Sequence, residues 1–193
     1  MKIKQLFLLL LLAGNAALAQ QIAVNTTDAA TGTRIIMTKN HAGTTIVPDD
    51  TVVKTGLAFF SVGYQKTNVQ NKEVETYFID LDMFHDNNKL GCIKQGESNA
   101  LITLEDGTEI QCFQISDTEC SPQAFKAAFA LAPKGSSATQ MKENFLKMQK
   151  VAITKIKIKT TEGYINYKIR SGSSEYIKRH FSLIEKTLNG NTK

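Results

Sequence analysis

The sequence predicts an α+β fold: a mostly antiparallel, meandering sheet, a helix near residues 140–150, and a C-terminal helix packed on one face of the sheet. Three observations support this fold class. Residues 153–160 and 164–170 alternate apolar and cationic side chains around a short turn, which is typical of half-buried antiparallel strands. Apolar residues in the segment 177–188 recur at helical spacing. Shorter alternating segments between turn-forming residues occupy the middle of the chain.

Residues 1–19 have the pattern of an export signal. Two lysines near the start precede an apolar run at 6–12 and the small residues Ala17 and Ala19. That run is too short for a membrane span, which needs about 20 apolar residues, and no later run is longer. We therefore expect cleavage after Ala19, a single α+β domain at 20–193 without a transmembrane span, and a soluble product in the periplasm or outside the cell.

The first two thirds of the mature chain contain several strand candidates. They are residues 34–38, 52–62, 74–84, 100–104 and 109–113. The last two are expected to form a hairpin with a three-residue loop and Gly107 in the left-handed conformation. This loop pairs Ile102 with Ile110 and Ala100 with Cys112, and so it keeps the apolar side chains on one face of the hairpin.

The segment at 121–132 fits two structures. Phe125 and Phe129 would share one face of a helix that begins near Ser121. The same two residues also continue an unbroken alternation with Ala127 and Leu131, which suits a strand that ends before a proline. We expect the strand.

A helix is expected directly before the last two strands. Ser137 and Gln140 have the spacing of a capping box. The apolar face of this helix consists of Met141, Phe145 and Met148.

The last two strands are expected to form a hairpin. A two-residue turn at 162–163 would set Lys157 opposite Lys168 and Lys155 opposite Arg170 on the solvent face. The isoleucines would then share the other face, because side chains alternate strictly along a strand. We expect the C-terminal helix, capped by Ser173 or Ser174, to cover these isoleucines.

Positive charge is concentrated near the C-terminus. Residues 20–133 contain 8 Lys and Arg against 14 Asp and Glu, whereas residues 134–193 contain 13 against 4. This asymmetry favours a surface for a polyanion, although lysines also serve simply as solvated, edge-protecting residues. The expected contacts, which we call the basic face, are Lys155, Lys157, Lys159, Lys168 and Arg170.

The favoured function is that of an exported, non-enzymatic binding or structural module of the cell envelope, which contacts an anionic lipid or glycan through the basic face. The sequence has no His-Glu-x-x-His, Cys-x-x-Cys, Gly-rich phosphate loop or Gly-x-Ser-x-Gly motif, and we expect no cofactor and no metal. It also has no Trp and no recognised nucleic-acid module, so we expect no nucleic-acid partner.

The alternative function is a carboxylate-dependent hydrolase that acts on an envelope glycan. It depends on the densest polar cluster of the chain, which consists of Asp80, Asp82, His85 and Asp86. The spacing lacks the Gly and the distant Glu of a calcium loop. Alternation predicts that Asp80 and Asp82 lie together on a solvent face.

The three cysteines, Cys92, Cys112 and Cys120, allow at most one internal disulfide. Three pairings are possible, and the spacing does not choose among them. A catalytic thiol needs a nearby histidine, and nothing in the sequence places one beside a cysteine. We therefore expect buried, inert thiols or one structural bridge.

The order of these features is itself informative. The export signal is followed by Asp-Ala-Ala-Thr-Gly-Thr-Arg at 28–34, a hairpin turn at 104–107, and a helix that leads into the strands at 153–158 and 163–165. This order resembles that of small exported β-rich proteins common in Bacteroidota. The resemblance covers most of the mature chain and supports the strand at 125–131. It implies no activity, cofactor or catalytic residue.

Overall fold

The computed structural model describes residues 21–49 and 53–190. The predicted signal peptide therefore lies outside the described residues. The elements in chain order are β1 (Ile22–Thr27), β2 (Arg34–Thr38), β3 (His41–Pro48), β4 (Gly56–Val69), β5 (Lys72–His85), β6 (Ala100–Leu104), β7 (Glu109–Gln114), β8 (Ala124–Ala130), α2 (Ala138–Lys150), β9 (Ile153–Lys159), β10 (Tyr164–Ile169) and α3 (Ser174–Leu188).

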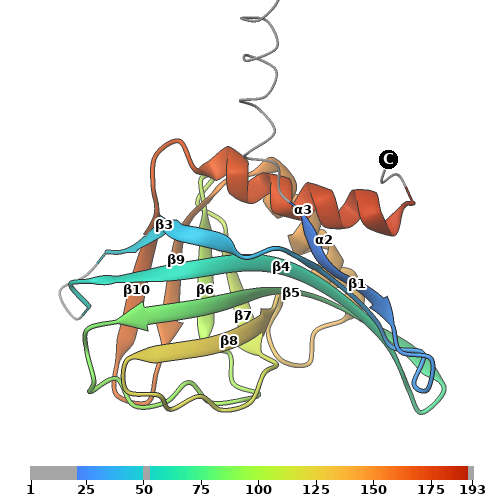
Figure 1. Cartoon of the computed structure of the whole chain (residues 1–193), viewed down its shortest axis with the longest axis horizontal. Coiled ribbons are helices and arrows are strands. Elements are labelled where there is room, and N and C mark those ends of the chain that lie inside the picture. Colours follow the sequence, from blue (N-terminus) through green and yellow to red (C-terminus); the bar gives the residue numbers. More distant parts are fainter. Residues whose placement is uncertain (1–20, 50–52, 191–193) are drawn as a thin grey trace, which may run out of the picture.

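The ten strands of the described residues form one antiparallel sheet that closes into a barrel (Figure 1). Their order is β1-β2-β4-β3-β10-β9-β6-β7-β8-β5, and β5 also pairs with β4. β3 pairs with the first half of β4 and belongs to the ring, whereas β2 pairs with the second half. The hairpin β1–β2 thus extends the sheet beside the ring. The predicted α+β class is confirmed, and the closure of the sheet is an additional finding.

Both helices pack against the inner side of the sheet. α3 lies against β2 and β4 and also contacts β9, whereas α2 packs on β5 and α3. The buried ring of Phe181 on α3 lies 6.2 Å from the ring of Phe60 on β4 and 5.5 Å from that of Phe145 on α2. Phe145 in turn lies 4.8 Å from Tyr77 on β5. Aromatic contacts therefore join the two helices to the two longest strands.

A buried polar contact anchors α3 to β2. Nδ1 of His180 lies 2.7 Å from Oγ1 of Thr38, and both residues are buried. The same Thr38 hydroxyl accepts a hydrogen bond from the backbone N–H of Val62 on β4. Because buried polar groups are costly unless they are hydrogen-bonded, these contacts define where the helix crosses the strands.

The predicted helix faces are confirmed, and one of the two predicted caps is wrong. Ser137 accepts a hydrogen bond from the backbone N–H of Gln140 at the start of α2. Ser173 occupies the N-cap position of α3, but its own backbone is helical and its side chain makes no capping hydrogen bond. The buried residues predicted for the two helices are Met141, Phe145, Met148, Ile177, Phe181 and Ile184.

The structure confirms the hairpin β6–β7. Ala100 pairs with Cys112 and Ile102 with Ile110, and the backbone N–H of Leu104 donates to the carbonyl of Thr108. The φ angle of Gly107 is 81°, which is the left-handed conformation that a three-residue loop requires.

The strand predicted at 125–131 is confirmed as β8. It pairs with β5 so that Phe125 lies opposite Met83 and Ala127 lies opposite Leu81. These side chains are buried in the interior of the barrel. The alternation, rather than the helical spacing, therefore predicted the correct element.

The predicted register of β9–β10 is wrong by two residues. Lys155, not Lys157, lies opposite Lys168, and Lys157 lies opposite Asn166. A shift of two residues leaves every side chain on its predicted face. Ile156 and Ile158 consequently remain in the core, and the lysines remain outside.

The cause of the shift is a wider turn that packs against the loop around Cys92. Thr160 donates its backbone N–H to the carbonyl of Gly163, which closes a four-residue turn. Oγ1 of Thr161 accepts a hydrogen bond from the backbone N–H of Cys92, and the Thr161 N–H donates to the Cys92 carbonyl.

A disulfide joins Cys92 to Cys120, and Cys112 is a buried free thiol. Next to the disulfide, Ile93 and Glu119 form an isolated β-bridge with two backbone hydrogen bonds. The disulfide therefore ties the loop after β5 to the loop before β8.

Replacement of Phe181 by Ala should lower the free energy of unfolding by about 3–5 kcal/mol, because it opens a cavity between the sheet and both helices. Phe84→Ala is the matched control. The Phe84 ring is 46% exposed, and its truncation should cost under about 1 kcal/mol. Urea denaturation monitored by circular dichroism measures both values. Equal losses in the two variants would contradict the central position of α3.

Candidate functional site

The five predicted basic residues lie on the outer face of β9 and β10. All of them are exposed, and they are Lys155, Lys157, Lys159, Lys168 and Arg170. β6 and β3 flank this face, with Leu101 opposite Lys157 on one side and Val47 opposite Lys168 on the other. The structure thus brings the predicted residues together on one surface of the barrel.

The basic face is only partly neutralised. Nζ of Lys168 lies 2.9 Å from Oδ1 of Asp49, which is the one ion pair of the face among the described residues. Nζ of Lys157 lies 4.1 Å from the ring centroid of Tyr164, which is a cation–π geometry. Lys155 has neither kind of contact within the described part of the chain.

The pairing of Lys155 with Lys168 is electrostatically unfavourable. The two residues lie directly opposite each other on neighbouring strands, where like charges lower the stability of a sheet. Exposure to solvent and the contact with Asp49 reduce this cost. An anion placed between the two ammonium groups would remove it.

Two residues of this surface escaped the sequence analysis. Tyr164 is 45% exposed and continues the alternation that puts Lys168 outside, so the sequence contained a signal for it. Asp49 follows β3, which pairs with β10 across a long separation in the sequence. No local pattern indicates that contact.

At one end of the basic face, Lys159 lines a cavity of about 290 Å³ beside the disulfide. Lys94, Glu97 and Asn99 also line this cavity. Both charge signs therefore meet there, and the purely cationic part of the surface ends at Lys159.

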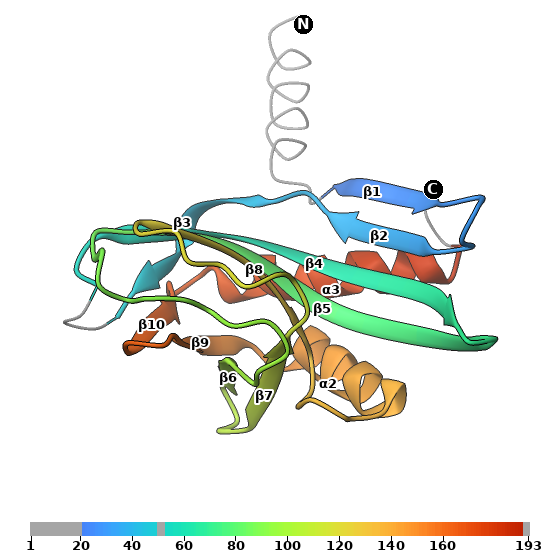
Figure 2. The same ribbon diagram turned by 90° about the horizontal axis from the view of Figure 1, so that it is seen from below.

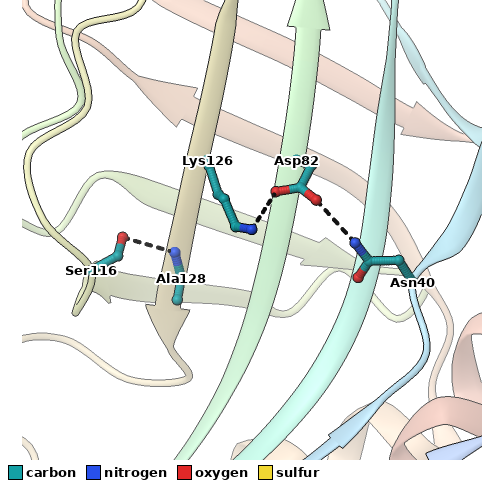
Figure 3. A network of polar contacts seen from close by, with 5 residues as sticks. All are labelled: Asn40, Asp82, Ser116, Lys126 and Ala128. Atoms are coloured by element: carbon teal, nitrogen blue, oxygen red, sulfur yellow. Dashed lines mark hydrogen bonds and ion pairs between the residues drawn. The ribbon is translucent and has the colours of Figure 1, made fainter. Parts of the chain in front are cut away.

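The second predicted site, the acidic cluster, lies on a different surface. Asp82 projects from the outer face of β5, where its Oδ2 accepts a hydrogen bond of 2.9 Å from Nδ2 of Asn40 (Figure 3). Its Oδ1 lies 3.8 Å from Nζ of Lys126 on β8. Beside them, Oγ of Ser116 accepts a hydrogen bond from the backbone N–H of Ala128. The Asp82 carboxylate is thus held between Lys126 of β8 and Asn40, which lies between β2 and β3.

Asp80 lies on the same outer face and is more buried than expected. Burial, and to a lesser extent the charge of Asp82, raise the pKa of its carboxyl to about 6, although Lys126 acts in the opposite direction. Across β4, Asp80 pairs with the fully buried Ser61. The prediction that both aspartates share one face is correct, but neither side chain is freely solvated.

The other two members of the cluster do not converge with the aspartates. His85 is buried inside the barrel, where its ring stacks on Phe125 at 4.9 Å and burial lowers the pKa of the imidazole. The carboxylate of Asp86 accepts hydrogen bonds from the backbone N–H groups of Lys54 and Thr55. Alternation separates His85 from the aspartates, because successive side chains of a strand point to opposite faces, and Asp86 lies beyond the end of β5.

An open cleft of about 350 Å³ borders the acidic cluster. It is lined by Asp82, Glu119 and Lys126 together with apolar side chains, and Asp80 is not part of its lining. Within the described residues, no group of three or more His, Cys, Asp or Glu side chains is placed to hold a metal ion.

Cys112 is not in a reactive environment. Its side chain is buried among apolar neighbours, and this burial raises the pKa of the thiol. In the described part of the chain, no helix combines the length and the apolar character that crossing a membrane requires.

The raised pKa of Asp80 predicts a specific pH dependence. Between about pH 4 and 6 the folded protein keeps a proton that the unfolded chain has released, so wild-type stability should fall as the pH rises through this window. Asp80→Asn should abolish that fall, which is on the order of 1–3 kcal/mol.

The measurement is urea unfolding of both proteins from pH 4 to 7, with Asp106→Asn as the control. Hydrogen bonds from Thr108, with a further contribution from Lys147, lower the pKa of Asp106 to about 2. The difference between wild type and Asp106→Asn should therefore be nearly constant above about pH 5. A constant difference for Asp80→Asn as well would show that this carboxyl has an ordinary pKa.

No family model, no curated protein and no solved structure matches this chain. The proposals for its function therefore depend on the geometry and the charges of its own residues.

Proposed function

We propose that the protein is an exported, non-enzymatic binding module that contacts an anionic glycan of the cell envelope through the basic face. The observation that carries the proposal is the pair Lys155–Lys168, two like charges held directly opposite each other on an exposed surface. A sheet bears such a pair at a cost to its stability. A bound polyanion would relieve the part of this repulsion that solvent and Asp49 do not screen.

The shape of the basic face favours a glycan over a lipid surface. Proteins that lie on membranes usually bury apolar side chains in the interface beside their cationic residues. Tyr164 is the only strongly exposed large hydrophobic residue of this face in the described chain. The others are on β4 and β5, and they are Leu57, Val69, Val74 and Phe84. A lipid surface remains the alternative partner that the experiment distinguishes.

Two features support export. Residues 1–19 have the composition of a signal peptide. The disulfide between Cys92 and Cys120 is of a kind that forms and persists in oxidising compartments, such as the periplasm and the extracellular space.

Charge reversal tests the proposal. The double variant Lys157→Glu/Lys168→Glu should weaken binding to polygalacturonate, a carboxylated polysaccharide, by at least about tenfold at low salt, since each cation near a charged surface contributes about 1 kcal/mol. Wild-type affinity should fall with rising salt, and the variant should show a shallower salt dependence. Biolayer interferometry measures both effects.

The matched control is Lys72→Glu/Lys134→Glu, which changes the net charge equally at two exposed lysines outside the basic face. This control should bind polygalacturonate within about twofold of wild type. Equal losses of affinity in the two double variants would show that net charge alone accounts for binding, and they would overturn the proposal. Binding to vesicles with anionic lipids, without binding to the polysaccharide, would assign the face to a membrane instead.

The hydrolase is the second candidate, and one observation favours it. Asp80 and Asp82 are adjacent carboxyls on one face, and Asp80 has a pKa of about 6, as a general acid requires. We rank it second because only Asp82 reaches the cleft.

If the protein hydrolyses an acidic glycan, Asp82→Asn should abolish product formation while the circular dichroism spectrum is unchanged. Reducing-end assays on purified protein measure this. Activity that persists in Asp82→Asn would exclude the carboxylate mechanism at this cluster.

A further inference from the structure

Another concave surface lies where the sheet extends beyond the ring. There, the second half of β4, the first half of β5 and the hairpin β1–β2 continue past the ring (Figure 2). A cleft of about 320 Å³ separates the β2–β4–β5 part of this extension from α2 and α3. Its lining residues are Arg34, Tyr64, Lys66, Glu75, Tyr77, Lys142, Phe145, Leu146, Glu185, Leu188 and Asn189.

One side of the cleft is aromatic. The rings of Tyr64 and Tyr77 lie 5.1 Å apart, and Tyr77 lies 4.8 Å from Phe145. All three residues are at least 97% buried, so their positions are set by packing. Leu146 and Leu188 add half-buried aliphatic surface from the two helices.

The strand side of the cleft carries cations in an unfavourable arrangement. Arg34 on β2 lies directly opposite Lys66 on β4. Nζ of Lys66 has a counter-ion, since it lies 2.7 Å from Oε1 of Glu73. Among the described residues, no carboxylate forms an ion pair with Arg34.

Glu75, the acid that the strands contribute to the cleft, already accepts a hydrogen bond. The hydroxyl of Tyr64 donates a hydrogen bond of 2.7 Å to Oε1 of Glu75. Burial raises the pKa of Tyr64, and it raises the pKa of Tyr77 to about 12, with the nearby glutamates adding to both shifts. Both hydroxyls therefore stay neutral and do not repel an anion in the cleft.

We propose that this cleft binds a small aromatic carboxylate, whose carboxylate contacts Arg34 and whose ring packs against Leu146 and Leu188 beside the buried aromatic rings. A guanidinium presents its N–H groups in a fork that matches a carboxylate with two hydrogen bonds. The volume lies at the lower end of the range of small-molecule sites, which limits the ligand to a compact one. The glutamates of the rim disfavour a second negative group on the ligand.

The proposal is independent of the basic face, which lies on the outer surface of other strands. The cleft is on the inner side of the extension, since Tyr64 and Tyr77 belong to the same buried face as the core of the barrel. The two ligands also differ in kind, because the basic face suits a long polymer and the cleft suits one small molecule.

The test is isothermal titration of the full mature chain with 4-phenylbutyrate and with its neutral amide. Wild type should bind the carboxylate with a Kd below about 1 mM and the amide at least about tenfold more weakly. Arg34→Gln should weaken the carboxylate at least about tenfold, and Arg34→Lys should have an intermediate effect because it keeps the charge but loses the fork. Arg179→Gln, at an exposed arginine of α3, should bind like wild type.

Amide chemical-shift mapping locates the bound probe without mutation. The shifts should concentrate at Tyr64, Glu75, Leu146 and Leu188, which line the cleft. Absence of binding, equal affinity for the amide, or unchanged affinity in Arg34→Gln would each overturn the proposal. So would tighter binding of galacturonate than of 4-phenylbutyrate, because a sugar acid has no aromatic ring to place against the apolar lining of the cleft.

Discussion

The pairing of β4 with β5 is the constraint on which the rest of the structure depends. All fourteen residues of each strand are paired, from Gly56 opposite His85 to Val69 opposite Lys72. The two-residue turn has positive φ angles at Gln70 and Asn71, and such turns match the right-handed twist of paired strands. β3 and β2 add to the free edge of β4, and β8 adds to that of β5. The ring and its extension therefore share one long ladder.

The same ladder explains why the candidate sites lie apart. Along β5, Ile79 and Leu81 point into the barrel, and Asp80 and Asp82 point out. Beyond the ring, the inner side of this ladder meets α2 and α3 rather than other strands, and the cleft forms there. The outer side near the ring holds the half-buried aspartates. The basic face belongs to the strands β9 and β10, which do not pair with this ladder: β3 lies between β10 and β4, and β6, β7 and β8 lie between β9 and β5.

Local chemistry made part of the fold predictable. Gly107 in its loop, Ser137 at the start of α2 and the alternation through β8 each depend on residues close together in the chain. β1 and β3 were missed because each mixes a few apolar residues with Thr and other polar residues. β1 is extended by its pairing with β2, and β3 by its pairing with β4 and the distant β10. The register of β9–β10, the disulfide partner of Cys92 and the closure of the ring likewise depend on long-range contacts. The basic face was predictable because a shift of two residues preserves the faces, whereas the cleft joins five elements and has no local pattern.

Two like-charged pairs occupy different settings in this protein, and the difference is informative. Lys155 and Lys168 lie opposite each other on an exposed outer face, where water already screens most of their repulsion. Arg34 and Lys66 lie opposite each other at a cleft between strands and helices, where the lower dielectric strengthens their interaction. A bound anion therefore gains more binding free energy per charge in the cleft. At the exposed face, strong binding requires several weak contacts together. A polymer with repeated charges suits the outer face for this reason, and a single compact anion suits the cleft.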